Sequence, residues 1–445
     1  MKLLGETRSL CPKCLKEIDA KVIEKNGKAV MRKTCKKHGT FEAFHLWDDP
    51  TMYAHMDKIF RDIVVVPDEM GFELTSRCNM RCPFCFTSAD RNGGGRKKIE
   101  FGKKEILKAI KNLRDRTIAF TGGEPTVRED LLEIIKEVKK RGLRTAILTN
   151  GLKLNKDYVE KLSNIGVDKV QLQFDALDDA TYQIIRGQKC LSKKLEALSN
   201  LKNSRIHVNL FVMLAKNVNN NQIKDIIKFA IKNSDVVRAI MFSSLCYEGR
   251  YNLKLKEMKT SEIMKDVEKQ TGIKREDFLE CTKFDVIFSN TIGKKLRAKS
   301  ISPCDTICYL YISGNRFIPI NRLLNLSMLS DMIGKNSSNK IKLFFSMCNP
   351  LNLKKIVKRK EGLMLLFKIS FSLLKQGSDK SNNKIDSVIG VIITSFHNRY
   401  NVDLNFLKNC TVHVYNGKKF VSFCEKNILW NKGKPIPSNI VKTFH

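Results

Sequence analysis

The chain has 445 residues, 42 % of them hydrophobic, which allows a large core and predicts two or three domains. It contains no run of about 20 apolar residues and no apolar signal-peptide core, so we expect a cytoplasmic protein without a membrane span. The chain has 81 Lys and Arg against 46 Asp and Glu, which gives a net charge of +35. This charge favours anionic partners, namely nucleic acid, lipid headgroups or acidic metabolites. The alternative is that the charge only reflects a Lys- and Asn-rich composition.

Residues 1–55 are expected to form a small metal-binding module. Cys11 and Cys14 make one Cys-x2-Cys knuckle, and Cys35 and His38 make a second. Asn26-Gly27, between two short apolar runs, is typical of a hairpin turn that would bring the knuckles together. Three thiolates and one imidazole suit tetrahedral zinc, or iron in a rubredoxin-like site. Free thiols are the alternative.

Residues 56–250 alternate short apolar runs with amphipathic ones, which predicts an α/β fold of parallel strands with covering helices. The expected strands are 71–75, 117–120, 145–148, 169–174, 206–213 and 239–242, and the expected helices are 106–113, 131–140 and 158–162. About six such units make a partial (β/α)6 TIM-type barrel. Polar motifs follow these strands, at the end where α/β barrels keep their chemistry.

The first of these motifs is a cysteine loop with the spacing Cys-x3-Cys-x2-Cys, formed by Cys78, Cys82 and Cys85. A tight loop of this kind can place three thiolates on three irons of a [4Fe–4S] cluster. The fourth iron then has no protein ligand, which suggests that a substrate or cofactor binds there. A zinc loop or unrelated thiols are the alternative.

The cysteine spacing, with Phe84 before the last cysteine, resembles the signature of the radical S-adenosylmethionine (SAM) superfamily. The resemblance implies that SAM is cleaved reductively at the cluster and that the resulting 5′-deoxyadenosyl radical abstracts hydrogen from an unactivated carbon. It also implies a reductant such as ferredoxin or flavodoxin as a partner.

Further strand ends match SAM-binding positions of that superfamily. The run Gly122-Gly123-Glu124-Pro125 resembles its GGEP motif, whose backbone and Glu bind the SAM amino group. The positions that resemble those lining the methionine and ribose parts of SAM are Thr149, Asn150, Gln173 and Asp175. Arg186 resembles the arginine that pairs with the SAM carboxylate. Capped turns or surface salt bridges are the alternative for each.

Residues 251–445 lose this alternation and gain Lys, Asn and Ser, so we expect a separate C-terminal auxiliary and substrate domain. The segments 331–340 and 376–384 are predicted loops. Between them, Leu353 to Leu374 is first basic and then apolar. This pattern fits a helix on a membrane surface and equally a pair of core helices, and we favour the core interpretation.

Eight cysteines lie outside the two N-terminal sites. We expect Cys190 to be a packed thiol, and Cys246 is ambiguous. Two pairs, Cys304 with Cys308 and Cys410 with Cys424, resemble auxiliary-cluster domains of radical SAM enzymes and imply at least one auxiliary [4Fe–4S] cluster. The candidate ligands are Cys281, Cys304, Cys308, Cys348, Cys410 and Cys424.

The order of all these motifs resembles a mainly archaeal radical SAM family that includes tetraether lipid synthases and proteins assigned to pterin methylation. The matching phrases are 172–175, 186–187, 400–403 and 421–424. We favour carbon–carbon coupling of archaeal lipid chains, with peripheral contact to the inner membrane face. The alternatives are a methyltransferase or other radical enzyme acting on a pterin-like small molecule or on RNA, and a non-catalytic iron–sulfur or zinc scaffold.

Overall fold

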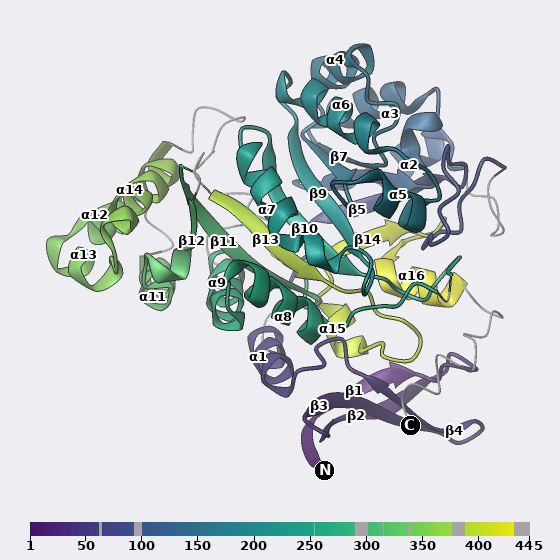
Figure 1. Ribbon diagram of the computed structural model, residues 1–445, viewed down its shortest axis with the longest axis horizontal. Helices are drawn as coiled ribbons and strands as arrows, with labels where there is room; N and C mark the ends of the chain where they lie inside the picture. Colours follow the sequence, from purple (N-terminus) through teal and green to yellow (C-terminus); the bar gives the residue numbers. More distant parts are fainter. Residues whose placement is uncertain are drawn as a thin grey trace.

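The computed structural model describes residues 1–61, 65–92, 100–252, 254–289, 301–314, 316–336, 340–375 and 388–430. A four-stranded antiparallel sheet at the N-terminus adjoins a body built on an 11-stranded sheet (Figure 1). The small sheet consists of β1 (Lys2–Leu10), β2 (Glu17–Lys25), β3 (Lys28–Cys35) and β4 (Gly39–Phe44). Asn26 and Gly27 join β2 to β3 with φ angles of 52° and 68°, which confirms the hairpin.

Six adjacent parallel strands form the centre of the large sheet, as the sequence predicts. They are β5 (Glu69–Thr75), β6 (Thr117–Gly122), β7 (Arg144–Thr149), β8 (Lys169–Gln173), β9 (His207–Leu214) and β10 (Val237–Ser244). Fully buried apolar residues fill their core faces, among them Phe72, Phe120 and Leu172. Because the six strands are parallel, their carboxyl ends meet at one edge.

Helices cover this parallel sheet between successive strands (Figure 1). They are α2 (Lys103–Ala109), α3 (Leu131–Lys139), α4 (Lys156–Ile165), α5 (Asp179–Arg186), α6 (Leu191–Lys202) and α7 (Ile223–Lys232). Each of the three predicted helices is present with shifted ends. The helix expected over 106–113 stops at Ala109, because Ile110 has left the helical region with φ −94° and ψ 2°.

Five strands from beyond residue 250 extend the same sheet on both sides, in the order β12-β11-β13 beside β10 and β14-β15 beside β5. They are β11 (Asp305–Ser313), β12 (Arg316–Pro319), β13 (Val388–Thr394), β14 (Val412–Tyr415) and β15 (Phe420–Ser422). The C-terminal region is thus an extension of the barrel sheet in the described residues, and the division of the chain at 55 and 250 stays a prediction.

The remaining helices are α1 (Pro50–Phe60), α8 (Thr260–Thr271), α9 (Arg275–Phe288), α11 (Leu326–Asn336), α12 (Lys340–Cys348), α13 (Pro350–Ile356), α14 (Lys360–Lys375), α15 (Leu404–Lys408) and α16 (Phe423–Trp430). The loop expected over 331–340 is wrong for residues 331–336, which continue α11 because Met332 and Ile333 are buried, and for Lys340, which begins α12. The loop expected over 376–384 lies outside the described residues. Within the described ranges, no helix is long and apolar enough to cross a membrane.

Candidate functional site

The cysteine loop follows β5, and its three thiols are partly exposed. Two backbone hydrogen bonds fix its ends: the Cys78 amide donates to the Asp90 carbonyl, and the Cys85 amide donates to the Arg250 carbonyl, both over 2.8 Å. Phe84 is 1 % exposed and packs in an apolar cluster with neighbours such as Ile185. The ring of Phe84 therefore anchors the loop in the core, and its contact with SAM stays a prediction.

Arg250 clamps this loop, a role that the sequence reasoning missed. Its guanidinium donates to three backbone carbonyls, those of Cys82 (2.8 Å), Ser88 (3.4 Å) and Ala89 (2.6 Å). The preceding Gly249 has φ +78°, and a Cβ there would lie 2.3 Å from the Phe86 carbonyl oxygen. A glycine followed by an arginine, a few residues after the last barrel strand, was the available sequence signal.

Gly122 and Gly123 bring the end of β6 against the segment that leads into the cysteine loop. A Cβ at Gly123 would lie 2.1 Å from the Arg77 carbonyl oxygen, and Gly122 has φ +125°. The amides of Gly123 and Glu124 donate to the carbonyls of Thr75 (2.7 Å) and Arg77 (2.9 Å). The two glycines therefore permit a close backbone contact that positions the loop.

Glu124 ties the ends of β6 and β7 together. Its side chain is 1 % exposed and accepts hydrogen bonds from the Thr149 hydroxyl and the Asn150 amide, both at 2.7 Å, and from Thr126. Pro125 begins the short turn Pro125–Val127 behind it. Both carboxylate oxygens are used within the protein, so a contact of Glu124 with the SAM amino group stays a prediction.

Asn150 links β7 to the cysteine loop. Its side-chain amide donates to Asn79 Oδ1 over 2.7 Å and lies 3.9 Å from Cys78 Sγ. The structure thus brings the predicted SAM residue Asn150 next to the first cysteine, although 72 positions separate them in the chain.

Asp175 and Arg186 form a buried bidentate ion pair. Arg186 Nε and Nη2 lie 2.7 and 2.8 Å from the two carboxylate oxygens of Asp175, which is fully buried. Arg186 also hydrogen-bonds to Cys82, which counteracts the rise that burial causes in the pKa of that thiol. Asp175 therefore orients Arg186 beside the cysteine loop, and direct SAM contacts of either residue stay a prediction.

Lys194 is a second buried cation near these residues, and sequence reasoning missed it. Its ammonium donates to the Asn150 carbonyl and, over 2.9 Å, to Gln173 Oε1, and it lies 5.8 Å from the centre of the Tyr182 ring. Burial lowers the pKa of Lys194. Lys194 occupies a buried position in the apolar stripe of α6, which is an unusual place for a lysine and was the available signal.

The thiols of the loop fit an iron–sulfur cluster. Burial raises the pKa of Cys78 to about 12 and raises that of Cys82, so both are protonated at neutral pH until a metal replaces the proton. The loop supplies three cysteines from a fixed backbone, beside the polar side chains of Asn150, Gln173 and Lys194. This donor set matches a cluster with three protein ligands and a polar small molecule at the fourth iron.

The two N-terminal knuckles meet in one site. The ligand atoms of Cys11, Cys14, Cys35 and His38 lie within 4.8 Å of one another, and His38 Nδ1 is 3.5 Å from the sulfurs of Cys11 and Cys35. Tetrahedral zinc with bonds of about 2.3 Å spaces its sulfurs by about 3.8 Å. The backbone amide of Lys37 contributes most to lowering the pKa of Cys35 to about 6, which favours the metal-binding thiolate. The expected Cys3His site is confirmed.

Buried polar contacts join the small sheet to the segment 399–403. The ammonium of Lys33 donates to the Arg399 carbonyl (3.1 Å), Ser9 Oγ donates to the Val402 carbonyl (2.5 Å), and the Thr7 hydroxyl donates to Asp403 Oδ1 (2.6 Å). The phrase at 400–403 therefore belongs to the docking surface of the small sheet.

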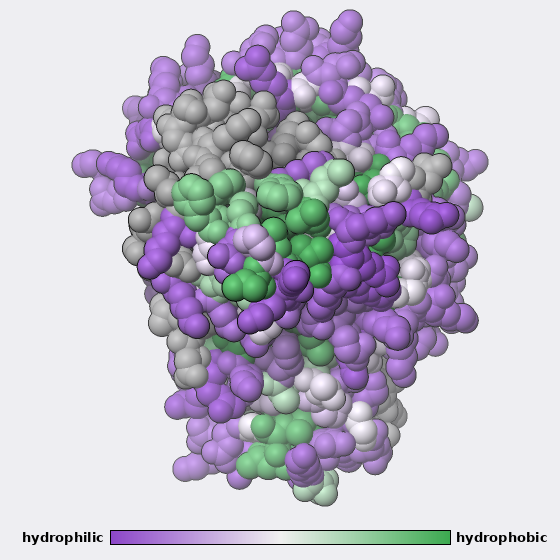
Figure 2. All heavy atoms as spheres, turned by 90° about the vertical axis from the view of Figure 1, so that its left-hand side faces the viewer, coloured by the Kyte–Doolittle hydropathy of each residue, from purple (hydrophilic) through white to green (hydrophobic). Residues whose placement is uncertain are grey.

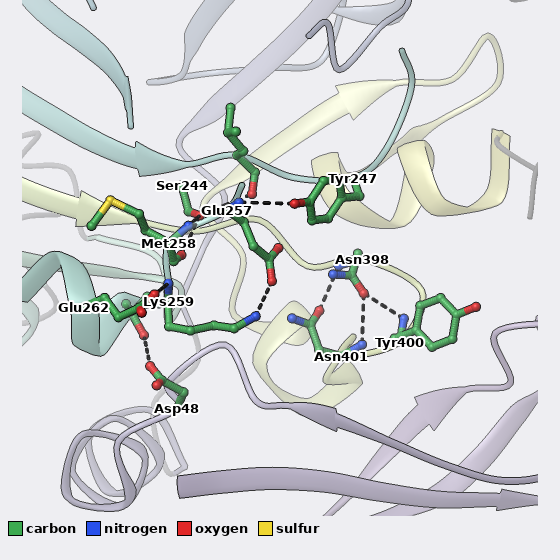
Figure 3. A network of polar contacts seen from close by, with 12 residues as sticks. Asp48, Ser244, Tyr247, Glu257, Met258, Lys259, Glu262, Asn398, Tyr400 and Asn401 are labelled. Atoms are coloured by element: carbon green, nitrogen blue, oxygen red, sulfur yellow. Dashed lines mark hydrogen bonds and ion pairs between the residues drawn. The ribbon is translucent and has the colours of Figure 1, made fainter. Parts of the chain in front are cut away.

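Figure 3 shows the neighbouring junction, where the loop after β10 meets the start of α8. Ser244 Oγ donates a hydrogen bond to the Met258 carbonyl over 2.6 Å. Asp48, which lies between β4 and α1, accepts a hydrogen bond from the Ser261 hydroxyl. A small cavity here is lined by residues that include His45, Cys246 and Asn398. Cys246 thus lies between the small sheet and the C-terminal extension.

Cys246, which follows β10, and three cysteines of the C-terminal extension influence one another's thiol pKa. The thiol pKa of Cys304 is raised by burial and by nearby Cys410 and Cys424, and that of Cys246 by burial, Glu248 and Cys424. The Cys410 thiol donates to the Val412 carbonyl over 3.1 Å, and backbone hydrogen bonds with Phe423 and His397 partly offset the rise that burial causes in the pKa of Cys410 and Cys424. Thiolates on one cluster sit on different irons, so they are spaced more widely than the ligands of one ion.

The strand geometry disfavours the expected pairing of Cys304 with Cys308 on one cluster, and the auxiliary ligand set stays a prediction. Asp305–Ser313 is an extended strand, and at about 3.3 Å per residue its geometry separates these two cysteines by about 13 Å. Cys308 instead contacts Cys281 on α9, and both are fully buried. Burial alone raises the pKa of Cys348, and no other cysteine in the described part of the chain contributes to that rise. The pKa influences therefore connect Cys424 with Cys246, Cys304 and Cys410, and connect Cys308 with Cys281.

Comparison with known proteins agrees with these sites. The Radical SAM superfamily matches residues 72–230, and the HMPTM N-terminal zinc ribbon domain matches residues 3–46. The 7,8-dihydro-6-hydroxymethylpterin dimethyltransferase of Methanocaldococcus jannaschii is 30% identical over 477 aligned positions, which cover 95% of this chain and 93% of that protein. A probable GTP 3',8-cyclase of Thermococcus kodakarensis is 32% identical over 174 residues, 38% of this chain and 55% of that protein.

Among solved structures, native anSMEcpe with bound AdoMet and Cp18Cys peptide matches 85% of this chain and 99% of that chain, with 16% sequence identity and a TM-score of 0.39. The expectation of lipid-chain coupling finds no support in these relatives, and the near full-length match bears the name of a pterin methyltransferase. The motifs that this chain shares with lipid and pterin enzymes do not identify the substrate, because they belong to the SAM chemistry that both kinds of enzyme use. The chain is a radical SAM enzyme with an N-terminal zinc ribbon, and it belongs to the family of 7,8-dihydro-6-hydroxymethylpterin dimethyltransferase.

Proposed function

We propose that this enzyme methylates a reduced pterin related to 7,8-dihydro-6-hydroxymethylpterin. The observation that carries the proposal is the alignment with the pterin dimethyltransferase, which spans 95% of this chain and includes the zinc ribbon and the C-terminal extension. A relative that shared only the barrel would support SAM chemistry alone. The proposal replaces lipid-chain coupling as the favoured function.

At the SAM site, Cys78, Cys82 and Cys85 hold a [4Fe–4S] cluster, which supplies the electron for reductive cleavage of SAM when it is bound. The SAM carboxylate is assigned to Lys194 in place of Arg186, because Asp175 already pairs with Arg186, whereas the buried ammonium of Lys194 has only neutral oxygens as hydrogen-bond partners in the described structure. Asp175 positions Arg186 beside Cys82, and Asn150 positions the loop at Cys78. Arg250 holds the loop backbone in place.

Cys246, Cys304, Cys410 and Cys424 hold an auxiliary [4Fe–4S] cluster in this proposal. The electrostatic influence of these thiols on one another's pKa, with Cys424 acting on both Cys246 and Cys304, supports it. Iron and sulfide are counted on anaerobically purified protein, and Cys424→Ala is compared with Cys348→Ala. We expect the first variant to lose about four irons and the second none. Equal iron content in both variants would contradict the assignment.

The pterin proposal is tested with anaerobically reconstituted enzyme, SAM, reduced flavodoxin and 7,8-dihydro-6-hydroxymethylpterin. Mass spectrometry should show products heavier by one or two methyl groups, and SAM labelled in its methyl group tells whether SAM is the methyl donor. Cys82→Ala should abolish both product and 5′-deoxyadenosine. Deoxyadenosine that forms without any methylated pterin, and that rises with archaeal lipid or RNA instead, would exclude the pterin while keeping the SAM chemistry.

A further inference from the structure

The helices α12, α13 and α14 form an arm at the β12 side of the large sheet (Figure 1). This helical arm carries half of the large apolar side chains that are exposed in the described residues. They are Phe345, Leu351, Leu363, Met364 and Phe367, with exposed fractions of 66%, 71%, 39%, 58% and 38%. Figure 2 faces this side of the molecule and shows apolar side chains grouped at the surface and rimmed by hydrophilic ones.

The apolar side chains are exposed although the opposite face of the arm is packed. Leu365 and Leu366 of α14 and Met347 of α12 are at most 1% exposed, so these helices are anchored in the core, as the sequence predicts. The arm therefore has two apolar faces, one packed in the core and one exposed to solvent. An exposed apolar group of this kind marks an interaction surface.

Lysines flank these apolar side chains at helical spacing. On α14, Lys360 and Lys368 each lie four residues from Met364, and on α13 Leu351 is followed by Lys354 and Lys355. All four lysines are exposed. Residues three or four apart lie on the same face of a helix, so the basic and apolar side chains share one surface.

The arm is strongly basic as a whole. Residues 340–375 contain nine Lys and Arg and one acidic residue, Glu361, which gives 9 − 1 = +8. Two copies of this surface would repel each other, which disfavours self-association. Phe345 and Phe367 could each stack on a base, but Leu351, Leu363 and Met364 could not, whereas the headgroup region of a bilayer accepts all five apolar side chains next to lysines.

We propose that the helical arm docks on an anionic lipid bilayer, with its exposed apolar side chains in the headgroup region and its lysines on the lipid phosphates. The arm lies on the β12 side of β10, whereas the cysteine loop follows β5 at the other end of the six parallel strands. The inference does not depend on the pterin as substrate.

The test is cosedimentation of the purified holoenzyme with vesicles of phosphatidylcholine alone or of phosphatidylcholine and phosphatidylglycerol in a 3:1 ratio. We expect binding to the anionic vesicles that weakens with added salt, and little binding to the neutral ones. Two variants dissect the surface: an apolar variant, Leu351→Ser with Met364→Ser and Phe367→Ser, and a charge variant, Lys354→Glu with Lys355→Glu and Lys360→Glu.

The charge variant should reduce vesicle affinity by about 100-fold or more, because one basic side chain near an anionic surface changes affinity by about fivefold. The apolar variant should also bind more weakly, because interfacial binding scales with the buried apolar area. The matched control, Ile184→Ser with Leu195→Ser, removes exposed apolar side chains elsewhere and should bind like the unmodified enzyme. Deoxyadenosine formation checks that all variants remain folded. The proposal is overturned if the holoenzyme ignores anionic vesicles, if the apolar variant binds them normally, or if single-stranded RNA binds more tightly and displaces the vesicles.

Discussion

The ring of Phe86 stacks on the ring of Phe423, with centroids 5.2 Å apart and planes inclined by 20°. Phe86 directly follows Cys85 of the SAM loop, and Phe423 directly precedes Cys424 of the C-terminal cysteine group. Phe396 completes the contact, 5.3 Å from Phe86 and 5.6 Å from Phe423. The two proposed cluster sites therefore adjoin each other through aromatic packing.

Phe423→Ala should disturb the C-terminal cysteine group more than the SAM loop. The loss of a partly buried aromatic contact costs about 2 kcal/mol, and Cys424 is the neighbouring residue. Denaturant unfolding of the anaerobic protein should show lower stability, and its iron content should fall. Phe345→Ala, which removes an exposed ring, is the control, and equal losses in both variants would refute the coupling.

Arg250→Ala should release the cysteine loop. The change removes hydrogen bonds from the guanidinium to three backbone carbonyls, each worth about 1 to 3 kcal/mol when a charged donor makes it. The single ammonium group of lysine cannot reproduce the forked geometry of the guanidinium, so Arg250→Lys should not hold the loop either. We expect at least tenfold slower deoxyadenosine formation in both. Arg114→Ala, which loses exposed bonds to the carbonyls of Lys111 and Leu113, should be unaffected.

Lys194→Met should weaken SAM binding by about 10- to 100-fold, because a charge-assisted contact with the carboxylate is worth about 1.5 to 3 kcal/mol. Equilibrium dialysis of the holoenzyme measures this directly, and circular dichroism checks the fold. S-adenosyl compounds that lack the carboxylate should bind the variant and the unmodified enzyme equally. If the variant discriminates against them as strongly as the parent does, Lys194 is not the carboxylate partner.

Cys14→Ala should remove zinc from the ribbon without touching the clusters. The remaining two thiols and His38 leave an incomplete tetrahedral site, so the zinc content measured by atomic emission should fall from about one to near zero. The ribbon docks on residues 399–403, so thermal stability should fall too. Cys190→Ala, which changes a buried thiol outside the ribbon, should keep its zinc.

Asp285→Asn should stabilise the protein at neutral pH and not in acid. Burial raises the pKa of Asp285 to about 6, so the folded state holds its proton where the unfolded state, with a pKa near 3.9, has lost it. Stability is therefore lost as pH rises from about 4 through 6. The asparagine avoids this loss of at most about 3 kcal/mol and still accepts the Tyr309 hydroxyl. Unfolding free energies that differ equally at pH 4 and pH 8 would contradict this account.

The sequence by itself determined the elements with strong local signals. The sequence predicts the cysteine loop, the two knuckles around Asn26-Gly27 and the six apolar strands. These features can be predicted because metal-ligand spacing, hairpin turns and strand periodicity are properties of short segments. The same locality explains why the SAM chemistry was recognised and the substrate was not.

Only the tertiary structure decided how distant residues combine. The sequence places Cys304 close to Cys308, whereas the fold extends that segment as a strand, and the pKa of Cys304 is influenced by the distant Cys410 and Cys424. Arg250 and Lys194 became functional candidates through contacts with residues 168 and 44 positions away. These contacts between residues far apart in the sequence arise from the packing of strands and loops against one another. The periodicity of a single segment carries no information about them.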